Sequence, residues 1–304
     1  AWRPMTRAAA RAALLAALSV SPQAPAPSTP AKTIGVHAWV ENDDGLPAST
    51  MSPADFQLLV DGTLVPIQQI APRAGGTSIV VLIDTSRSVT WDREVLERHV
   101  SEFAAALGPD DRTSIATFGA RASVPPFKAA QRDVRGELRL ALERRDQEGY
   151  GSSPVWDAMY EAVTVLAREP GARAILLLTD GRATGNRYGL GQVADYAMTN
   201  GVCISAVLKH SSQWISQGGG TAALVQPGAP IQGLAAFTGG MYFTYPESQD
   251  DQARAVFKRV ASTLTATHVF SFTPPQFDGL PHRLVIRPIR QYVDVHAPLG
   301  FVAR

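Results

Sequence analysis

Three short segments carry oxygen-bearing side chains that could bind a metal ion. The first, 84–88, reads Asp-Thr-Ser-Arg-Ser and supplies the carboxylate of Asp84 and the hydroxyls of Ser86 and Ser88. The second is a Gly/Ser-rich turn within 149–157, and the third is Thr-Asp-Gly at 179–181. Hard oxygen ligands with few carboxylates suit Mg²⁺ or Mn²⁺, which prefer octahedral oxygen shells and keep several waters. So few protein ligands leave one position for an outside group, such as a carboxylate of a partner protein.

Two of these segments directly follow apolar runs that the sequence predicts to be buried strands. The runs are 79–83 and 174–179, and both lack the alternation of a strand with one solvated face. The carboxyl ends of parallel strands meet at one edge of a sheet, where α/β proteins bind their ligands. The turn within 149–157 could reach the same edge. We therefore expect the three segments to converge.

Strands and amphipathic helices alternate from 77 to 265, with helical spacing of the apolar residues between the apolar runs. This order predicts an α/β fold with a doubly wound, mostly parallel sheet covered by helices on both faces. Helices are expected at 92–107, 133–144, 155–167, 192–199, 231–237 and 252–264, and further strands at 113–118, 122–127, 202–208 and 241–245. The Gly/Ser/Gln-rich segment 210–230 is expected to be a long loop.

The flanks of this domain, 31–76 and 266–304, are rich in short strands instead. The N-terminal flank has a strand at 34–40 and a hairpin, 56–60 and 64–70, around Asp61-Gly62. The C-terminal flank has strands at 267–273, 282–288 and 292–296 with no helix between them. Because both flanks are rich in short strands, one small β module built from both flanks is favoured, although two independent β extensions would give the same pattern.

Residues 5–30 have the composition of a secretory signal peptide followed by a Pro/Ala-rich linker. Arg7 and Arg11 precede the apolar run 12–20, and small residues and prolines follow it. The run is too short to span a bilayer as a helix, and no other segment is long and apolar enough to do so. The sequence thus predicts export to the periplasm or the cell exterior; an Ala-rich helical tail is the alternative.

The three oxygen-bearing segments together resemble the metal-ion-dependent adhesion site of the von Willebrand factor type A family. The resemblance covers about 77–265. The 84–88 segment matches the family's Asp-x-Ser-x-Ser motif, and Asp180 matches the Asp-Gly that follows a hydrophobic strand. The run 155–158 fits the segment that follows the family's threonine ligand, which places Ser153 at the threonine position; Ser152 is the alternative.

This resemblance implies a metal site and a role in protein binding. The implied ligands of a Mg²⁺ or Mn²⁺ ion are Asp84, Ser86, Ser88, Ser153 and Asp180. The β-rich flanks make the chain similar to uncharacterised exported bacterial proteins of this family. The expected partner is a protein that offers an Asp or Glu carboxylate to the metal.

Composition excludes several other classes of function. The net charge is +1 with scattered basic residues, so no basic stripe for nucleic acid is present. The single cysteine, Cys203, cannot form an internal disulfide, and the six histidines lack the spacing of a zinc hydrolase. We therefore expect a binding module without catalytic residues. A metal-independent scaffold of the cell envelope is the main alternative, and a hydrolase using metal-bound water would lack a general base beside the motif.

Overall fold

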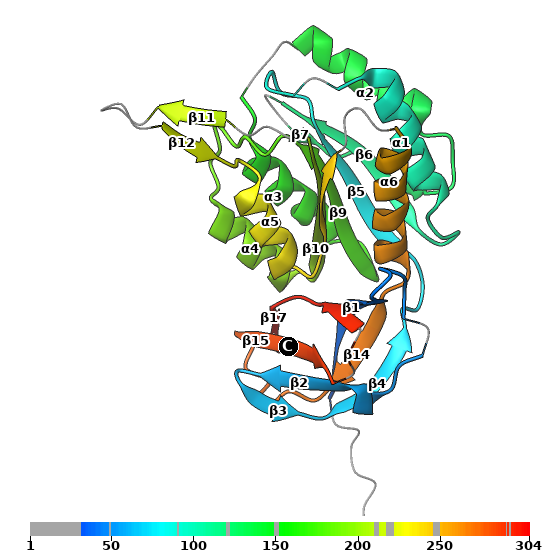
Figure 1. Ribbon diagram of the computed structural model, residues 1–304, viewed down its shortest axis with the longest axis vertical. Coiled ribbons are helices and arrows are strands. Elements are labelled where there is room, and N and C mark those ends of the chain that lie inside the picture. Colours follow the sequence, from blue (N-terminus) through cyan, green and yellow to red (C-terminus); the bar gives the residue numbers. More distant parts are fainter. Residues whose placement is uncertain are drawn as a thin grey trace, which may run out of the picture. The chain divides into compact units, whose positions relative to one another are not determined.

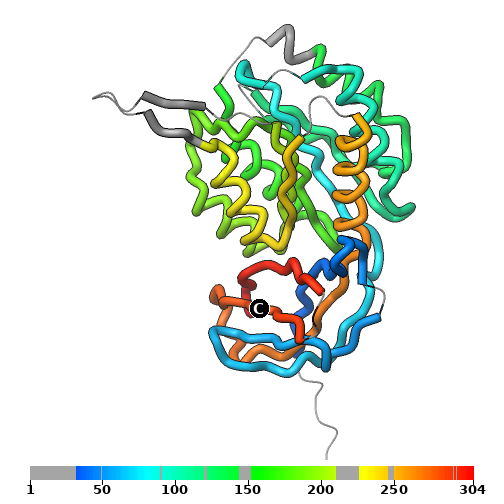
Figure 2. The backbone as a smooth tube through the Cα atoms, viewed as in Figure 1, coloured from blue at the N-terminus to red at the C-terminus, as the bar shows by residue number. Residues whose placement is uncertain are grey.

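A computed structural model describes residues 32–48, 50–89, 91–119, 122–148, 152–209, 213–216, 222–245, 250–289, 291 and 293–304. Residues 33–304 form one compact unit, to which the elements below belong (Figure 2). The predicted signal peptide and linker at 5–30 lie outside the described residues. In the described ranges, no helix has the length and apolar character needed to cross a membrane.

The central sheet has the strand order β13-β10-β9-β5-β6-β7, with β8 also paired to β6. Five strands run parallel: β5 (Thr77–Asp84), β6 (Arg112–Phe118), β9 (Ala172–Thr179), β10 (Val202–Lys209) and β13 (Tyr242–Tyr245). The short strands β7 (Ala122–Ser123) and β8 (Lys128–Ala129) pair antiparallel with β6. Every residue of β5 is buried, as expected for a strand covered on both faces.

Helices cover both faces of this sheet (Figure 1). On one face lie α1 (Arg93–Ala105), α2 (Arg135–Glu148) and α6 (Asp250–Thr265), which pack against Ile79, Val81 and Ile83. On the other face lie α3 (Val155–Leu166), α4 (Leu190–Thr199) and α5 (Ala229–Phe237), which pack against Val80 and Leu82. Alternate residues of one strand thus enter two separate apolar cores, and the predicted doubly wound α/β class is confirmed.

The flanks pair with each other in two antiparallel sheets. One sheet has the order β16-β1-β14-β4 and the other β17-β15-β2-β3. From the N-terminal flank come β1 (Ile34–Asn42), β2 (Phe56–Val60), β3 (Thr63–Val65) and β4 (Ile67–Pro72). From the C-terminal flank come β14 (His268–Phe272), β15 (Pro281–Pro288), β16 (Val293–His296) and β17 (Gly300–Val302). Side chains of both flanks fill a shared apolar core, in which Phe56 and Phe270 meet edge to face.

Two local expectations are corrected by the structure. The expected strand 64–70 is interrupted, because β3 pairs with β2 in one sheet while β4 crosses to pair with β14 in the other. The segment 210–230 is not a loop throughout, since β11 (Gln213–Ser216) and β12 (Ala222–Val225) form an antiparallel pair and α5 begins at Ala229. The Gly/Ser content that suggests a loop is equally suited to a hairpin turn.

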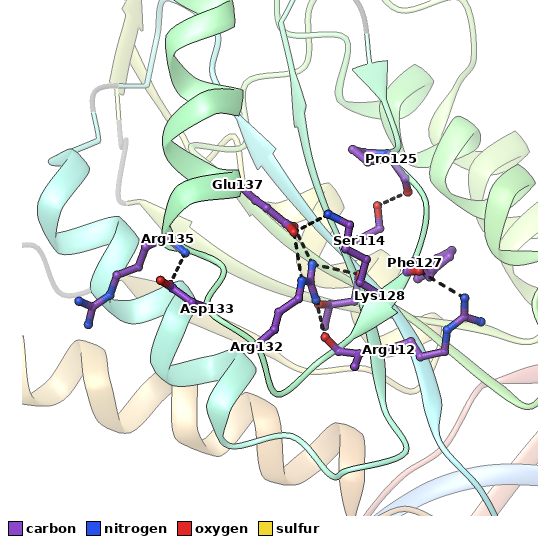
Figure 3. A network of polar contacts seen from close by, with 11 residues as sticks. Arg112, Ser114, Pro125, Phe127, Lys128, Arg132, Asp133, Arg135 and Glu137 are labelled. Carbon is purple, nitrogen blue, oxygen red and sulfur yellow. Dashed lines mark hydrogen bonds and ion pairs between the residues drawn. The ribbon is translucent and has the colours of Figure 1, made fainter.

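Ion pairs fix the start of α2 against the edge of the sheet (Figure 3). Glu137 accepts from Nζ of Lys128 at 2.6 Å and from Nη2 of Arg132 at 2.7 Å. Arg132 also donates to the side chain of Thr113 in β6, at 2.7 Å. The two basic side chains hold the pKa of Glu137 at about 2. The helix is therefore joined to the sheet by charge as well as by apolar packing.

The two flank sheets, with their shared core, form a β sandwich. Polar contacts join this β sandwich to the α/β domain, in addition to the two places where the chain passes from one to the other. The backbone nitrogen of Leu299 donates to the carbonyl of Phe237 at 2.9 Å. Nη2 of Arg259 in α6 donates to Oε2 of Glu41 in β1 at 2.8 Å. These contacts place β1 beside α6, and the segment before β17 beside the end of α5.

Candidate metal site

The candidate site begins where two neighbouring parallel strands end. Ile83 of β5 is in register with Leu178 of β9, so Asp84 and Thr179 follow side by side at the carboxyl edge of the sheet. The hydroxyl of Thr179 donates to Oδ2 of Asp84 at 2.5 Å. The parallel register alone therefore brings a hydroxyl next to the carboxylate.

Asp84 is a fully buried carboxylate that accepts hydrogen bonds on both oxygens. Its Oδ1 accepts from the backbone nitrogen of Ser86 at 2.9 Å, and its Oδ2 also accepts from Oγ of Ser153 at 2.9 Å. Burial raises the pKa of Asp84, and the hydrogen bonds from Thr179, Ser86 and Ser153 oppose that rise. The carboxylate is thus desolvated, and neutral hydroxyls and an amide surround it.

The loop after β5 holds its two serines close together. Thr85 anchors the loop, because its backbone nitrogen and its hydroxyl both donate to the carbonyl of Phe118, at 2.8 and 2.7 Å. The hydroxyl oxygens of Ser86 and Ser88 are 3.2 Å apart. Ser86 is buried, whereas Ser88 is exposed to solvent. Two hydroxyls therefore share one corner of the site, at the border between the interior and solvent.

Ser153, and not Ser152, faces Asp84. The backbone nitrogen of Ser153 donates to the hydroxyl of Thr184 at 2.9 Å, and the nitrogen of Thr184 donates back to the carbonyl of Ser153 at 2.8 Å. This pair of bonds turns the buried Ser153 side chain inward. Ser152 is exposed and lies against Gly185, where an added Cβ would come within 2.9 Å of the Ser152 Cβ.

Asp180 lies next to Thr179 and is also buried. Its Oδ1 accepts from the backbone nitrogen of Arg182 at 3.0 Å, and its Oδ2 is 3.5 Å from Nε of the same arginine. Between them, Gly181 adopts a φ of +83°, and a Cβ there would come within 2.8 Å of the backbone nitrogen of Gly228. Only glycine fits this turn without strain, so the turn holds Asp180 at the sheet edge with a cation beside it.

The sequence placed Thr179 in the third oxygen-bearing segment, but Thr179 was not counted among the implied ligands. Thr179 lies directly before Asp180 and directly after Leu178, which pairs with Ile83. The parallel pairing of β5 with β9 was therefore the feature that could have identified it. Asp157 lies outside the predicted ligand set and holds the loop after β9: it accepts from the backbone nitrogens of Arg187 and Tyr188 at 2.8 and 2.9 Å.

The donor set suits a hard cation of octahedral geometry. In the described part of the chain, no group of three or more His, Cys, Asp or Glu side chains could hold a metal ion. Hydroxyls must therefore supply most of the ligands. Adjacent oxygens around Mg²⁺ are about 3.0 Å apart if each lies about 2.1 Å from the ion. The Ser86–Ser88 separation of 3.2 Å and the Ser153–Asp84 separation of 2.9 Å match this spacing.

These features define a class: a doubly wound α/β domain with an oxygen-rich cluster at the carboxyl edge of its sheet. Residues 78–214 match the family model of the von Willebrand factor type A domain. The chain therefore contains a domain of the von Willebrand factor type A family, as the resemblance of its motifs predicted. A search of the curated proteins finds no match.

Several solved structures are similar to this chain. A von Willebrand factor type A protein from Catenulispora acidiphila is 12% identical over 90% of this chain and 75% of that one, with a TM-score of 0.49. An aerotolerance-related membrane protein from Bacteroides fragilis is 16% identical over 62% of this chain and 98% of that one, with a TM-score of 0.47. Proximal thread matrix protein 1 from the mussel byssus, with a zinc-occupied metal-ion-dependent adhesion site, is 18% identical over 67% of this chain and 50% of that one, with a TM-score of 0.47.

Proposed function

We propose that this protein is an exported module that binds a partner protein through a divalent metal ion, Mg²⁺ or Mn²⁺. The residues that would hold the ion, directly or through water, are Asp84, Ser86, Ser88, Ser153 and Asp180. The metal supplies a positive centre that attracts an anionic ligand. A carboxylate from an Asp or Glu of the partner completes its shell.

The observation that carries this proposal is the way the buried charge of Asp84 is surrounded. Another buried aspartate of this chain, Asp111, is neutralised by Arg73, whose Nη2 lies 3.2 Å from its Oδ1. No Lys, Arg or His of the described residues forms an ion pair with Asp84, whose hydrogen-bond partners are neutral groups. A buried carboxylate without a cation costs several kcal/mol. An external cation would remove that cost.

Basic side chains near the site favour an acidic partner. Arg87 lies between Ser86 and Ser88 and is exposed to solvent. Arg182, beside Asp180, is partly exposed as well. The two guanidinium groups add positive potential around the metal and would guide a carboxylate toward it. The serine and aspartate side chains act as ligands in this proposal, which leaves none of them as a general base, so the role is binding and not catalysis.

One contact favours the second candidate, a metal-independent scaffold of the cell envelope. The guanidinium of Arg182 already lies beside Asp180 at 3.5 Å and neutralises part of the charge that a metal would balance. In this alternative the domain binds its partner by surface contacts alone. The difference between the two functions is therefore the response of partner binding to removal of the metal.

Calorimetric titration with Mg²⁺ and Mn²⁺ tests the metal site directly. The wild-type chain is expected to bind one ion, and the Asp84→Ala variant to bind none. Asp157→Ala is the matched control, because Asp157 holds a loop and lies outside the proposed ligand set. Equal binding by wild type and Asp84→Ala would refute the proposal.

Affinity capture from an extract of the source cells tests the partner. The bound chain is loaded in Mg²⁺ and eluted with EDTA, and Asp84→Ala serves as the control bait. Proteins that elute with EDTA and are absent from the control support metal-dependent binding. Proteins retained equally in EDTA support the scaffold. N-terminal sequencing of the protein from those cells tests export, since cleavage after the apolar run 12–20 is expected.

A further inference from the structure

A cavity of about 300 Å³ lies at the amino-terminal edge of the central sheet, opposite to the candidate metal site. Its walls include the first residues of three central strands, Thr77, Ala172 and Val202, and parts of β1 and β17. The cavity therefore lies where the β sandwich meets the α/β domain, and it is partly open to solvent. Its volume is at the lower end of the range for sites that hold small molecules.

Part of the cavity wall is apolar and sulfur-rich. Met198, Cys203 and Met241 line it together with the backbone of several glycines. Cys203 is half-buried, and the surface that it keeps faces the cavity; burial raises the pKa of its thiol to about 12, so the thiol stays protonated. Thioether and thiol groups in such a wall behave as adaptable apolar surface. This part of the wall suits a short hydrocarbon chain or a ring.

Another part of the cavity wall carries a positive charge. Arg173 lines the cavity, and its Nε and Nη1 donate to the carbonyls of Glu169 and Asn200 at 2.7 and 2.8 Å. Among the described residues, no carboxylate forms an ion pair with Arg173. A guanidinium held in place by two carbonyls, and not neutralised by them, is a suitable donor for an anionic oxygen.

Among the other polar groups that line the cavity, Thr267 and His37 bear most on what it could bind. The hydroxyl of Thr267 is buried, and among the described residues it has no hydrogen-bond partner. A buried hydroxyl without a partner costs free energy that a ligand oxygen could recover. Burial, and then the charge of Arg73, lowers the pKa of His37, so this imidazole adds no second cation at neutral pH. Arg173 is thus the main charged group available to a ligand.

Strand alternation gives the cavity two distinct ends. Arg173 is in register with Val202, so it shares the sheet face that α4 covers, whereas Cys203 belongs to the opposite face, packed against the core of α1 and α6. The cavity therefore passes beneath the edge of the sheet from a cationic end to an apolar end. We propose that it binds a small amphipathic carboxylate, with the carboxylate at Arg173 and the apolar part against Cys203 and Met241, while Met198 of α4 lines the wall on the Arg173 face.

Methyl NMR of methionine gives a test with internal controls. The chain has five methionines, of which Met198 and Met241 line the cavity while Met159 lies in the core of α3 and Met51 in the β sandwich. Protein labelled with [methyl-13C]methionine is titrated with octanoate and, separately, with 1-octanol. EDTA is present throughout, so that the result is independent of the metal site. Leucine substitutions at Met198 and Met241 assign the two resonances.

Octanoate is expected to shift the Met198 and Met241 resonances saturably and to leave Met51 and Met159 unchanged. Because a charge-assisted bond to Arg173 is stronger than a neutral one, octanoate should bind roughly fivefold to tenfold more tightly than 1-octanol. Arg173→Met should reduce octanoate affinity to that of 1-octanol and leave 1-octanol binding unchanged.

The comparison of the two probes in the wild-type chain keeps the test valid if Arg173→Met fails to fold. Saturable binding of octanoate that exceeds that of 1-octanol supports the proposal. The absence of a saturable shift at Met198 and Met241 overturns it, and so do equal shifts at Met159. Equal or tighter binding of 1-octanol overturns the assignment of a carboxylate ligand.

Discussion

Replacing Asp84 by asparagine should separate the cost of its buried charge from the benefit of a bound metal. Asparagine keeps the shape of the side chain, and its Oδ1 can still accept from the backbone nitrogen of Ser86. Its amide can donate to the hydroxyls of Ser153 and Thr179, which accept as readily as they donate. The local fold should therefore remain, while the charge that attracts a cation is lost.

The difference in the free energy of unfolding between the wild type and Asp84→Asn is expected to change sign between EDTA and Mg²⁺. In EDTA, the wild-type chain carries a carboxylate of 0% exposure with hydroxyl and amide partners only. Loss of that uncompensated charge should leave Asp84→Asn as stable as the wild type, or more stable by up to about 2 kcal/mol. In Mg²⁺ at one hundred times its Kd, the wild type should gain about 2.7 kcal/mol, and the variant almost nothing. For a domain of this size the gain corresponds to a rise in Tm of roughly 5–10 °C.

Urea unfolding in EDTA and in saturating Mg²⁺ measures these free energies. Asp157→Asn is the matched control, since it removes a carboxylate that accepts from Tyr188 and Arg187 and should keep the full Mg²⁺ increment. Equal stability of the wild type in both conditions would refute the reasoning. An increment retained by Asp84→Asn would show that the ion binds elsewhere.

Three further predictions concern single side chains. Ser153→Ala should weaken Mn²⁺ binding at least about tenfold in calorimetric titration, whereas Ser152→Ala should leave it unchanged, because only Ser153 bonds to the site. Hydrogen bonds from His282 to the carboxylates of Asp61 and Asp278 raise the pKa of His282. Its protonated form therefore adds stability that is complete below pH ~6.5 and is lost as the pH rises through the higher folded value; His282→Gln should remove this part of the pH dependence of urea unfolding. The pKa of Glu137 is lowered to about 2, so its ion pairs stabilise the fold above pH ~4.5 and cease to do so as the pH falls toward 2. Glu137→Gln should cost about 1 kcal/mol at pH 7, since the pairs are partly exposed, and a cost that persists at pH 2 would contradict this explanation.

Much of the sheet could be predicted because buried parallel strands leave a clear pattern. The apolar runs that end at Asp84 and Thr179 are strands in the structure, and their shared edge follows from parallel pairing. The contact of Thr179 with Asp84 was not predicted, because it depends on the register between β5 and β9, which periodicity does not specify. The orientation of Ser153 depends on Thr184, a residue of another loop.

Other features arise from contacts between segments distant in sequence. The short strands of the flanks could be predicted from the sequence. The crossing of β4 from the β2–β3 hairpin to β14 could not, because it depends on which apolar face meets which sheet. The pair β11–β12 lies in a segment of Gly, Ser and Gln, where composition predicts a turn and a loop equally. The cavity could not be predicted either, because its walls come from both the β sandwich and the α/β domain.

Arg182 offers a last test, because it distinguishes the two proposed functions at one position. Its Nε lies 3.5 Å from Oδ2 of Asp180, so it competes with a metal ion for that carboxylate. Arg182→Gln should therefore raise the affinity for Mg²⁺ roughly threefold to tenfold, a modest gain because the arginine is partly exposed.

The same substitution removes a positive charge that would attract the partner's carboxylate. If the metal carries the interaction, partner capture in Mg²⁺ should weaken less in Arg182→Gln than in Asp84→Ala, because the ion remains bound. If the arginine itself holds the partner, as in the scaffold alternative, Arg182→Gln should reduce capture in both Mg²⁺ and EDTA, and Asp84→Ala should have little effect. An unchanged Mg²⁺ affinity in Arg182→Gln would mean that the guanidinium does not compete for Asp180.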